Sequence, residues 1–487
     1  MLSPTSKELV ENTHPLDEKI VDYNDGSKEK DPAITAVESG FLRKIDMMIL
    51  PIICAINFLQ YLDKTTINYA ALLHFKEDLH LDGNQFNFAG SVFYIGYLVF
   101  QLPNNYLLQR IAIGRYIGVV VFVWGMVLVC TGFVQNFSQL SALRFLLGFF
   151  EGGIYPALTL LISTFYRKKE QAARLGYVWL CNGLATAVGG LIAYGIGRMN
   201  DHGIARWRWL MFIFGAVTCF IGLVAFFFLI GDPKSRFLRL TPEQEALVDE
   251  RTRDNLVYRT KTIKREQQIE ALKEVRLWAF FAASFFFSLR NGGMTIYISQ
   301  ITKSFGFSGL QSILLTIPIG VLDAAVILLT VYIANKTKQT LYVASGSMVI
   351  GTIGTVLMIV IPNPKLKLIG QYLGLSAVPT YILMLASISN NVSGYSKKIF
   401  CNSMMIVCYT VGNAVGPFIM APQFAPTYVK GFAIYICTSM LGVACLLIAR
   451  WQMVMANRRK AAQPSNTVTN VEDDLTDIQD PNFVYRL

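Results

Sequence analysis

Long apolar stretches recur along the chain and are separated by short polar or turn-forming segments. A helix that crosses a bilayer needs about 20 predominantly apolar residues, and these stretches reach that length. The approximate spans are 45–72, 86–109, 114–134, 140–166, 171–197, 208–230, 276–303, 309–333, 340–361, 365–390, 396–421 and 430–455. The pattern therefore predicts an all-α membrane protein with twelve transmembrane helices.

Basic residues fall in alternate loops between these spans. They include Arg43, Lys44, Arg110, Arg115, Arg167, Lys169, Lys336, Lys338, Lys397, Lys398, Arg458 and Lys460. Loops that are rich in lysine and arginine stay on the cytoplasmic side of a membrane. We therefore expect an even number of spans, with both chain termini in the cytoplasm.

The largest polar interruption divides the spans into six and six. It holds the stretch TPEQEALVDERTRDNLVYR, in which a threonine cap and a proline predict the start of an amphipathic helix. We predict two pseudo-symmetric six-helix halves, 41–230 and 276–457, joined by a cytoplasmic linker, 231–275. The polar tails, 1–40 and 458–487, are expected to be disordered and cytoplasmic.

Composition agrees with a chain that is solvated by lipid. Hydrophobic residues make up 53% of the 487 residues and charged residues 15%, against about 25% charged residues in soluble domains. The net charge of +11 is spread over short loops, which argues against nucleic-acid binding.

Residues 1–40 show no cleavable signal peptide. All eight cysteines fall in predicted spans, which excludes a disulfide framework. We expect the plasma membrane, with an endomembrane as the alternative, and a monomer.

Two charges lie inside the predicted fourth span, which contains the stretch RFLLGFFEGGIYP. Arg144 and Glu151 share one helix face with Gly148 and Tyr155, at helical spacing. A charge at mid-membrane costs about 2.5–3.5 kcal/mol, so a retained one indicates a substrate, ion or pairing role. At 1.5 Å per residue the two charges are about 10 Å apart along the axis, too far for a direct bond.

Few carboxylates lie inside the predicted spans. Glu151, Asp63 and Asp323 are the candidates for proton coupling, because an acid in a partly dry site can exchange a proton near neutral pH. The alternative for Glu151 is a glutamate that only hydrogen-bonds a neighbouring helix. A guanidinium suits an organic anion, so Arg144 is a candidate substrate contact, and its alternative is an ion pair with Asp63.

The first span carries a polar stripe in which Tyr61, Lys64 and Asn68 follow at helical spacing. These three residues are candidate substrate contacts. In the second half, Arg290 and Asp323 lie at similar predicted depth, either as a structural ion pair or with Arg290 holding substrate. Asn291 and Asn413 are candidate neutral hydrogen-bonding residues of the same site.

Several motifs together resemble one family. These are YLDKTTINYA, LPNNYLLQRIAIGR, RFLLGFFEGGIYP, NGGMTIYISQITKSFGFS, NNVSGYSKKIF and GNAVGPFIMAPQFAPTYVKGF. Over residues 41–455 the chain is similar to the fungal allantoate permease family, in the anion:cation symporter branch of the major facilitator superfamily. In related sialin and vesicular glutamate carriers, positions matching Arg144 and Lys64 contact substrate. The inner loop after the second span lacks the superfamily's usual Gly-x-x-x-Asp-Arg latch.

This resemblance implies a proton-coupled carrier of a small organic anion or vitamin, such as allantoate, nicotinate, pantothenate, biotin or cysteine. The spans contain no nucleophile–base set, metal-ligand cluster or phosphate loop, so we predict neither an enzyme nor a cofactor. The expected partners are the organic anion, protons and the lipid bilayer. A uniporter or exchanger with the same fold and a non-transporting nutrient sensor are the alternatives.

Overall fold

The computed structural model describes residues 32–108, 110–200, 203–255, 264–420, 422–425, 427–462 and 474–487. Within these ranges the regular structure is helical and no strand is present. Helices of the first group, which we call the N-terminal group, are α2 (Leu50–Ala70), α4 (Gln85–Leu108), α5 (Ile113–Thr131), α6 (Phe137–Glu151), α7 (Ile154–Phe165), α8 (Lys168–Gly197) and α9 (Arg206–Phe228). They are preceded by α1 (Pro32–Met48) and include the short α3 (Phe75–Asp78).

A second set of helices forms the C-terminal group. It comprises α12 (Val275–Ser304), α13 (Gly309–Leu314), α14 (Thr316–Thr337), α15 (Thr340–Val360), α16 (Lys367–Gly374), α17 (Pro379–Asn391), α18 (Tyr395–Ile419) and α19 (Val429–Ala462). Short 3₁₀ turns lie at Arg236–Leu238, Pro364–Leu366, Leu375–Ala377 and Pro422–Phe424. The linker between the groups holds α10 (Pro242–Asn255) and α11 (Arg265–Lys273).

Ten segments of the described chain are long and apolar enough to cross a membrane. The helices α4 and α12 are not among these ten, but they have 24 and 30 residues. At 1.5 Å per residue both exceed the thickness of the hydrocarbon core, about 30 Å. The structure is therefore consistent with the twelve spans predicted from the sequence.

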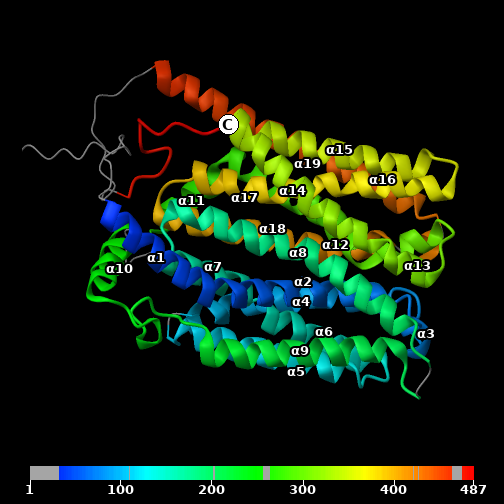
Figure 1. Cartoon of the computed structure of the whole chain (residues 1–487). Helices are drawn as coiled ribbons and strands as arrows, with labels where there is room; N and C mark the ends of the chain where they lie inside the picture. Colours follow the sequence, from blue (N-terminus) through cyan, green and yellow to red (C-terminus); the bar gives the residue numbers. More distant parts are fainter. Residues whose placement is uncertain are drawn as a thin grey trace, which may run out of the picture.

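The two groups lie side by side along their length (Figure 1). Inside them α5 packs on α9, α4 on α6, and α12 on α18. Between them the main contacts are α8 with α14, α4 with α18, and α2 with α12. Figure 1 places α1, α10 and α11 at one end of the bundle and α3 and α13 at the other. We call these the terminal end and the distal end.

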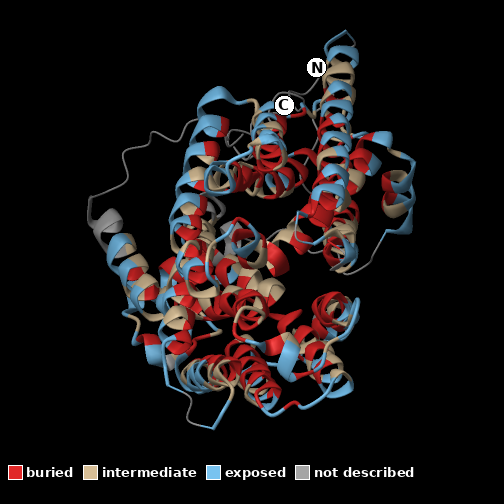
Figure 2. Cartoon of the chain, turned by 90° about the vertical axis from the view of Figure 1, so that its right-hand side faces the viewer, coloured by how far each residue is buried: buried red, intermediate tan, exposed pale blue. Residues whose placement is uncertain are grey.

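Large apolar side chains cover the outside of the bundle. Phe220, Phe228 and Val321 are each more than 60% exposed, and Figure 2 shows exposed positions on the periphery and buried positions between the helices. In water such a surface would drive aggregation, whereas lipid tails solvate it. The distribution is that of a multi-pass membrane protein.

The predicted linker helix is present as α10. It begins at Pro242, and the hydroxyl of Thr241 accepts a hydrogen bond of 3.3 Å from the backbone N–H of Gln244, as expected of a capping threonine. Arg251 of α10 pairs with Glu38 of α1 and with Glu170 of α8. This helix is thus fixed to the N-terminal group, whereas α11 contacts α18 and α12.

The prediction of disordered tails is wrong for part of each tail. Residues 32–40 belong to α1, which packs through the buried Phe41 and Ile45, while residues 1–31 lie outside the described residues. At the other end, α19 continues to Ala462, and residues 474–487 are held against the C-terminal group by ion pairs and hydrogen bonds. Polar composition predicted disorder, but these polar side chains have specific partners.

Candidate functional site

The centre of the candidate site is an ion pair between α2 and α6. The Nζ atom of Lys64 lies 2.9 Å from Oε1 of Glu151, whose side chain is fully buried. The contact is not aligned as a hydrogen bond, and neither carboxylate oxygen of Glu151 has a hydrogen-bond partner. One flexible ammonium is therefore the principal group that balances this buried carboxylate.

Helix geometry explains how Glu151 reaches this place. The predicted fourth span is divided into α6 and α7 at Gly152 and Gly153, directly after Glu151. A Cβ atom on Gly148 would lie 1.8 Å from the backbone oxygen of Phe93, so this glycine lets α4 pack directly on α6. The close approach brings the aromatic side chains of α4 beside the ion pair.

Aromatic rings surround Lys64. Its Nζ lies 6.0 Å from the ring centroid of Phe93 and 5.6 Å from that of Tyr97, both on α4. Tyr409 of α18 lies near Lys64 and Glu151, and its ring centroid lies 4.6 Å from that of Tyr381. The site therefore has walls from both helix groups, with aromatic faces that favour a cation and stack on planar ligands.

Asp63 and Arg144 are buried near one another without forming an ion pair. Oδ2 of Asp63 accepts a hydrogen bond of 2.8 Å from the indole N–H of Trp124 on α5. Arg144 is 3% exposed, and its Nε and Nη2 atoms have no hydrogen-bond partner. Among the described residues no acidic side chain lies within ion-pair distance of Arg144, so the Arg144–Asp63 pair that the sequence left open is not formed.

The C-terminal group contributes uncharged and charged residues at its centre. Asn291 of α12 donates a hydrogen bond of 2.8 Å to Asn413 of α18, so two predicted site residues contact each other. Arg290 donates from Nη2 to the backbone oxygen of Gly374, at 2.7 Å, where α16 ends. Asp323 of α14 has an unpartnered, buried Oδ1. Within the described chain Arg290 and Asp323 form no ion pair, so that alternative is not observed.

Two predicted site residues on α2 have different surroundings from Lys64. Asn68 donates to the hydroxyl of Ser299 on α12, at 2.7 Å, and its side-chain oxygen accepts from the Ser299 backbone N–H at 3.0 Å. Asn68 therefore closes a contact between the groups and is not open to a ligand. Tyr61 is half-buried and lies near Asp323 and Tyr409.

The Asn68–Ser299 contact belongs to a seal at the distal end. Tyr297 of α12 donates to Asn87 of α4, and Lys76 of α3 donates to Gln300 of α12 at 2.5 Å. Within the described residues, the hydrogen bonds that join the two groups all belong to this seal. The site is consequently closed towards the distal end.

Sequence reasoning missed Trp124 and Gln60. Trp124 is fully buried and orients Asp63, while Gln60 donates weakly to the Glu151 backbone oxygen, at 3.5 Å. A signal for Gln60 was present, since it precedes Lys64 by one helical turn. Nothing in the sequence distinguishes Trp124 from a lipid-facing aromatic residue.

No group of histidine, cysteine, aspartate or glutamate side chains that could hold a metal ion occurs in the described ranges. All eight cysteines are free. The charged side chains at the centre include the cations Lys64 and Arg144 and the carboxylates Glu151 and Asp323. Cations of this kind are suited to bind an anion, and carboxylates can accept a proton. Membrane-length helices in two groups around such a site define a membrane carrier.

The comparisons with known proteins agree with this class. The pattern of the Major Facilitator Superfamily matches residues 53–417. The allantoate permease of Saccharomyces cerevisiae is 31% identical, over 100% of this chain and 93% of its own length. The chain belongs to the major facilitator superfamily and, within it, to the family of fungal allantoate permease-like transporters. It is a transporter and not an enzyme.

Other relatives and solved structures are similar over most of their length. The thiamine pathway transporter THI73 of the same yeast is 28% identical, over 94% of this chain and 87% of its own. A bacterial homologue of the human lysosomal transporter Spinster, in an inward-facing, unoccupied conformation, has a TM-score of 0.62 at 15% identity, covering 87% of this chain and 98% of that one. A D-xylose–proton symporter has a TM-score of 0.61 at 13% identity, covering 84% and 97%. The structural matches establish the fold.

Proposed function

We propose that this protein takes up a small organic anion together with protons by alternating access. The observation that carries the proposal is the Lys64–Glu151 ion pair at 2.9 Å, beside an arginine with unpartnered N–H groups. The substrate class is a carboxylate of vitamin or metabolite size, such as allantoate, nicotinate, pantothenate, biotin or cysteine. The similarity to the yeast allantoate permease supports the inclusion of allantoate.

Coupling follows from competition for Lys64. While Glu151 is ionised, its carboxylate occupies the lysine ammonium. A proton on Glu151 removes that negative charge and frees the ammonium for the carboxylate of the substrate. Anion and proton then enter together, and the loaded site carries the same net charge as the empty one, which keeps the cost of occlusion low.

Arg144 provides the second part of the anion site. Its Nε and Nη2 atoms lie on one edge of the guanidinium, which is the edge that a carboxylate binds with two parallel hydrogen bonds. A buried N–H without a partner costs free energy, and a ligand that supplies acceptors recovers it. Asp63, oriented by Trp124, balances the charge of Arg144 from a distance.

The C-terminal group supplies the opposite wall. Tyr409 and the Asn291–Asn413 pair offer neutral hydrogen bonds, and Asp323, with its unpartnered Oδ1, is a second proton acceptor. Arg290 is already bonded to the backbone of Gly374, so we assign it to holding the end of α16 in place of direct substrate binding.

We also propose a membrane orientation, a location and an oligomeric state for this carrier. Basic residues of the loops gather at the terminal end, and the positive-inside rule then places that end and both chain termini in the cytoplasm. We assign the carrier to the plasma membrane. Because both walls of the site come from one chain, a monomer suffices for transport.

Uptake into proteoliposomes tests the function. Purified protein is given a panel of radiolabelled vitamins, ureides and amino acids, with an imposed inward proton gradient, and the Glu151→Gln variant is measured beside it. We expect at least one carboxylate to accumulate above its external concentration, and a protonophore to abolish the accumulation. Glu151→Gln is expected to exchange labelled for unlabelled substrate but not to accumulate it.

Three outcomes would overturn the proposal. Accumulation that ignores the protonophore would exclude proton coupling, and exchange without accumulation in the wild type would indicate an exchanger or uniporter. Binding of a panel member without any movement across the membrane would indicate a sensor. A Glu151→Gln variant with unaltered accumulation would remove Glu151 from the coupling.

A further inference from the structure

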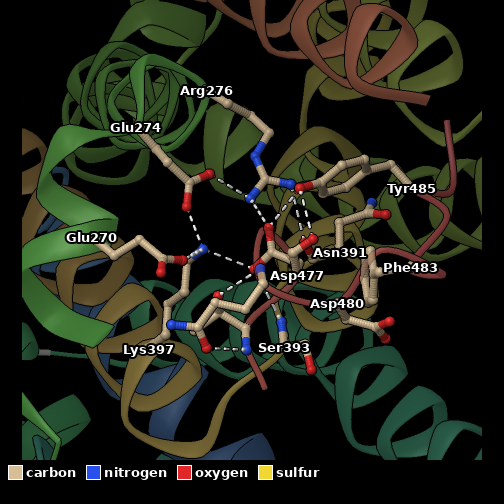
Figure 3. A network of polar contacts seen from close by, with 12 residues as sticks. Glu270, Glu274, Arg276, Asn391, Ser393, Lys397, Asp477, Asp480, Phe483 and Tyr485 are labelled. Carbon is tan, nitrogen blue, oxygen red and sulfur yellow. Dashed lines mark hydrogen bonds and ion pairs between the residues drawn. The ribbon is translucent and has the colours of Figure 1, made fainter. Parts of the chain in front are cut away.

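The terminal end of the C-terminal group holds a second cluster of charges, far from the candidate transport site. Its centre is Asp477, which is fully buried although it lies in the segment that follows α19. Oδ2 of Asp477 accepts from Arg276 at 2.7 Å, and Oδ1 lies 2.9 Å from Nζ of Lys397. The hydroxyl of Tyr485 donates to Oδ2 at 2.8 Å (Figure 3).

The cationic side chains of this cluster belong to two helices that carry the transport site. Arg276 lies in the first turn of α12, which holds Asn291, and Lys397 lies in the first turn of α18, which holds Asn413. Lys397 is completely buried and also contacts Glu270 and Glu274. Asp477 therefore bridges the beginnings of both helices, as does Glu274, which directly precedes α12.

A second carboxylate of the segment caps α18. Oδ1 of Asp474 accepts a hydrogen bond of 2.7 Å from the backbone N–H of Tyr395, the first residue of that helix. Gln267 of α11 accepts from the next N–H group, that of Ser396, at 3.1 Å, and donates to the Asp474 backbone oxygen at 2.9 Å. The N–H groups that a helix start leaves unsatisfied are thus paired with this segment and α11.

Backbone hydrogen bonds extend the docking to the other helices of the group. The Asn391 side chain of α17 donates to the Arg486 backbone oxygen at 2.8 Å and accepts from its N–H at 2.6 Å. Asn457 of α19 makes the same paired contact with the Tyr485 backbone, at 2.9 Å each way. Main-chain hydrogen bonds and clusters of cations facing acidic side chains are both recurring features of peptide recognition.

We propose that α11, α12, α17, α18 and α19 form a binding site for an acidic peptide at the terminal end, that residues 474–487 of the same chain are its occupant, and that the bound segment fastens α12 to α18. The contacts described above all end on the C-terminal group or on α11, which packs against it. The segment therefore does not connect the N-terminal group to the C-terminal group. It stabilises the packing of helices within the C-terminal group.

Fastening these two helices matters for a carrier whose two groups move against each other. The Asn291–Asn413 bond joins α12 and α18 at mid-length, and the hydroxyl of Ser284 donates to the backbone oxygen of Met405 nearer their beginnings. At the beginnings themselves, Glu274 contacts Lys397 directly, and the bound segment adds Asp477 between Arg276 and Lys397. Contacts at several heights, including the one that the segment supplies, resist pivoting of one helix against the other. Fastening of α12 to α18 requires only the transporter fold. It does not depend on proton coupling or on the identity of the substrate.

Hydrogen exchange of the full-length protein tests the fastening without any substrate. The double variant Asp474→Asn/Asp477→Asn removes both carboxylates, and Asp480→Asn is the matched control, because Asp480 accepts from the backbone of Asn482 inside the segment. We expect amide exchange in the first turns of α12 and α18 to rise together, at least tenfold, in the double variant. Exchange in α5 and α9 is expected to remain unchanged, as is all exchange in the control.

A binding measurement tests the site itself. A fluorescein-labelled peptide with the sequence of residues 474–487 is added to the double variant in detergent, and a peptide carrying both Asp→Asn changes serves as the control. We expect the acidic peptide to bind and to restore the lost protection, and the neutral peptide to do neither. Unchanged exchange at α12 and α18, equal effects of Asp480→Asn, a rise that includes α5 and α9, or no difference between the peptides would each overturn the proposal.

Discussion

Lys64 on α2 and Glu151 on α6 form an ion pair at 2.9 Å in which Lys64 is 21% exposed and Glu151 is fully buried. Removing only the lysine leaves an uncompensated buried carboxylate, which costs about 3–5 kcal/mol. We therefore expect Lys64→Met to lower the Tm in detergent strongly, and Lys64→Met/Glu151→Gln to regain most of it.

A transport measurement distinguishes a role of the Lys64–Glu151 ion pair in substrate binding from a purely structural role. The double variant is expected to be folded and yet to take up no anion, because it lacks the ammonium that we propose as the binding group for the carboxylate. Wild-type uptake in a stable double variant would show that the pair only holds helices together.

Arg144 is expected to act through the shape of its guanidinium. Arg144→Lys keeps the charge but loses the fork of donors, and a charge-assisted hydrogen bond contributes about 1.5–3 kcal/mol. We predict that the KM for the anion rises about 10- to 100-fold, with a smaller change in kcat. Arg198→Lys is the control, because Arg198, which directly follows α8, is exposed and donates a hydrogen bond to the hydroxyl of Tyr194 in that helix.

The close approach of α4 to α6 depends on Gly148. In Gly148→Ala the added Cβ would meet the Phe93 backbone oxygen at 1.8 Å, so the helices must separate and carry Phe93 and Tyr97 away from Lys64. Such overpacking costs about 1–3 kcal/mol, and we expect a lower Tm together with weaker substrate binding. Gly176→Ala has no atom within 4 Å of its added Cβ and is expected to be neutral or slightly stabilising.

The distal seal is expected to respond to pH through Lys76 in the short α3. Burial lowers the pKa of Lys76 to about 8; Glu77 opposes this shift and Lys303 adds to it. When the seal opens, the amine returns to water, where its pKa is about 10.4. The closed seal then binds fewer protons than the open one between about pH 8 and 10, so closure gains stability as pH rises through that window.

Spin labels at Asp82→Cys and Ser308→Cys, in a background with all native cysteines replaced by serine, measure this response. The population with a short distance is expected to grow between pH 7.5 and 9.5 in the presence of Lys76. In Lys76→Met the distances should not change with pH, and a response that persists there would assign the titration to another group.

The acidic segment 474–487 is expected to behave differently with pH. Burial alone would raise the pKa of Asp477, but Arg276 and Lys397 more than offset it and hold the pKa below its ordinary value. A depressed carboxylate pKa gives stability that is present above the unfolded value, near 4, and is lost only as pH falls through the folded value. Protection of α12 and α18 in hydrogen exchange should therefore be the same at pH 5 and pH 8, after correction for the intrinsic exchange rate.

Apolar length and loop charge were sufficient to predict the fold. The linker helix at Pro242 and the charged pair of residues 144 and 151 could also be read directly, since each depends on local sequence. The ion-pair partner of Glu151 could not be predicted from the sequence. Helical spacing placed Arg144 too far from Glu151 for a direct bond and showed that Lys64 faces the interior. Whether Lys64 reaches Glu151 depends on how α2, α4 and α6 pack, and Gly148 sets the close approach of α4 to α6.

The ordered tail was not predictable for a related reason. Asp474 and Asp477 lie in a polar segment that resembles a solvated tail, and Lys397 counted as a topology signal in a loop. Their pairing is a long-range contact without any periodic pattern. Composition indicates whether a segment would be ordered in isolation. A buried cation elsewhere in the chain can order the segment by pairing with its carboxylates.

Lys64 and Asn68 are one turn apart on α2, so the charge that we propose as the substrate contact and the amide of the distal seal are about 6 Å apart along one rigid helix. A substrate analogue with a bulky group next to its carboxylate would reach Asn68 and break its hydrogen bonds to Ser299. Such a molecule is expected to arrest the carrier with its distal end open. Inhibitors of this protein should accordingly divide by size into simple competitors and conformational traps.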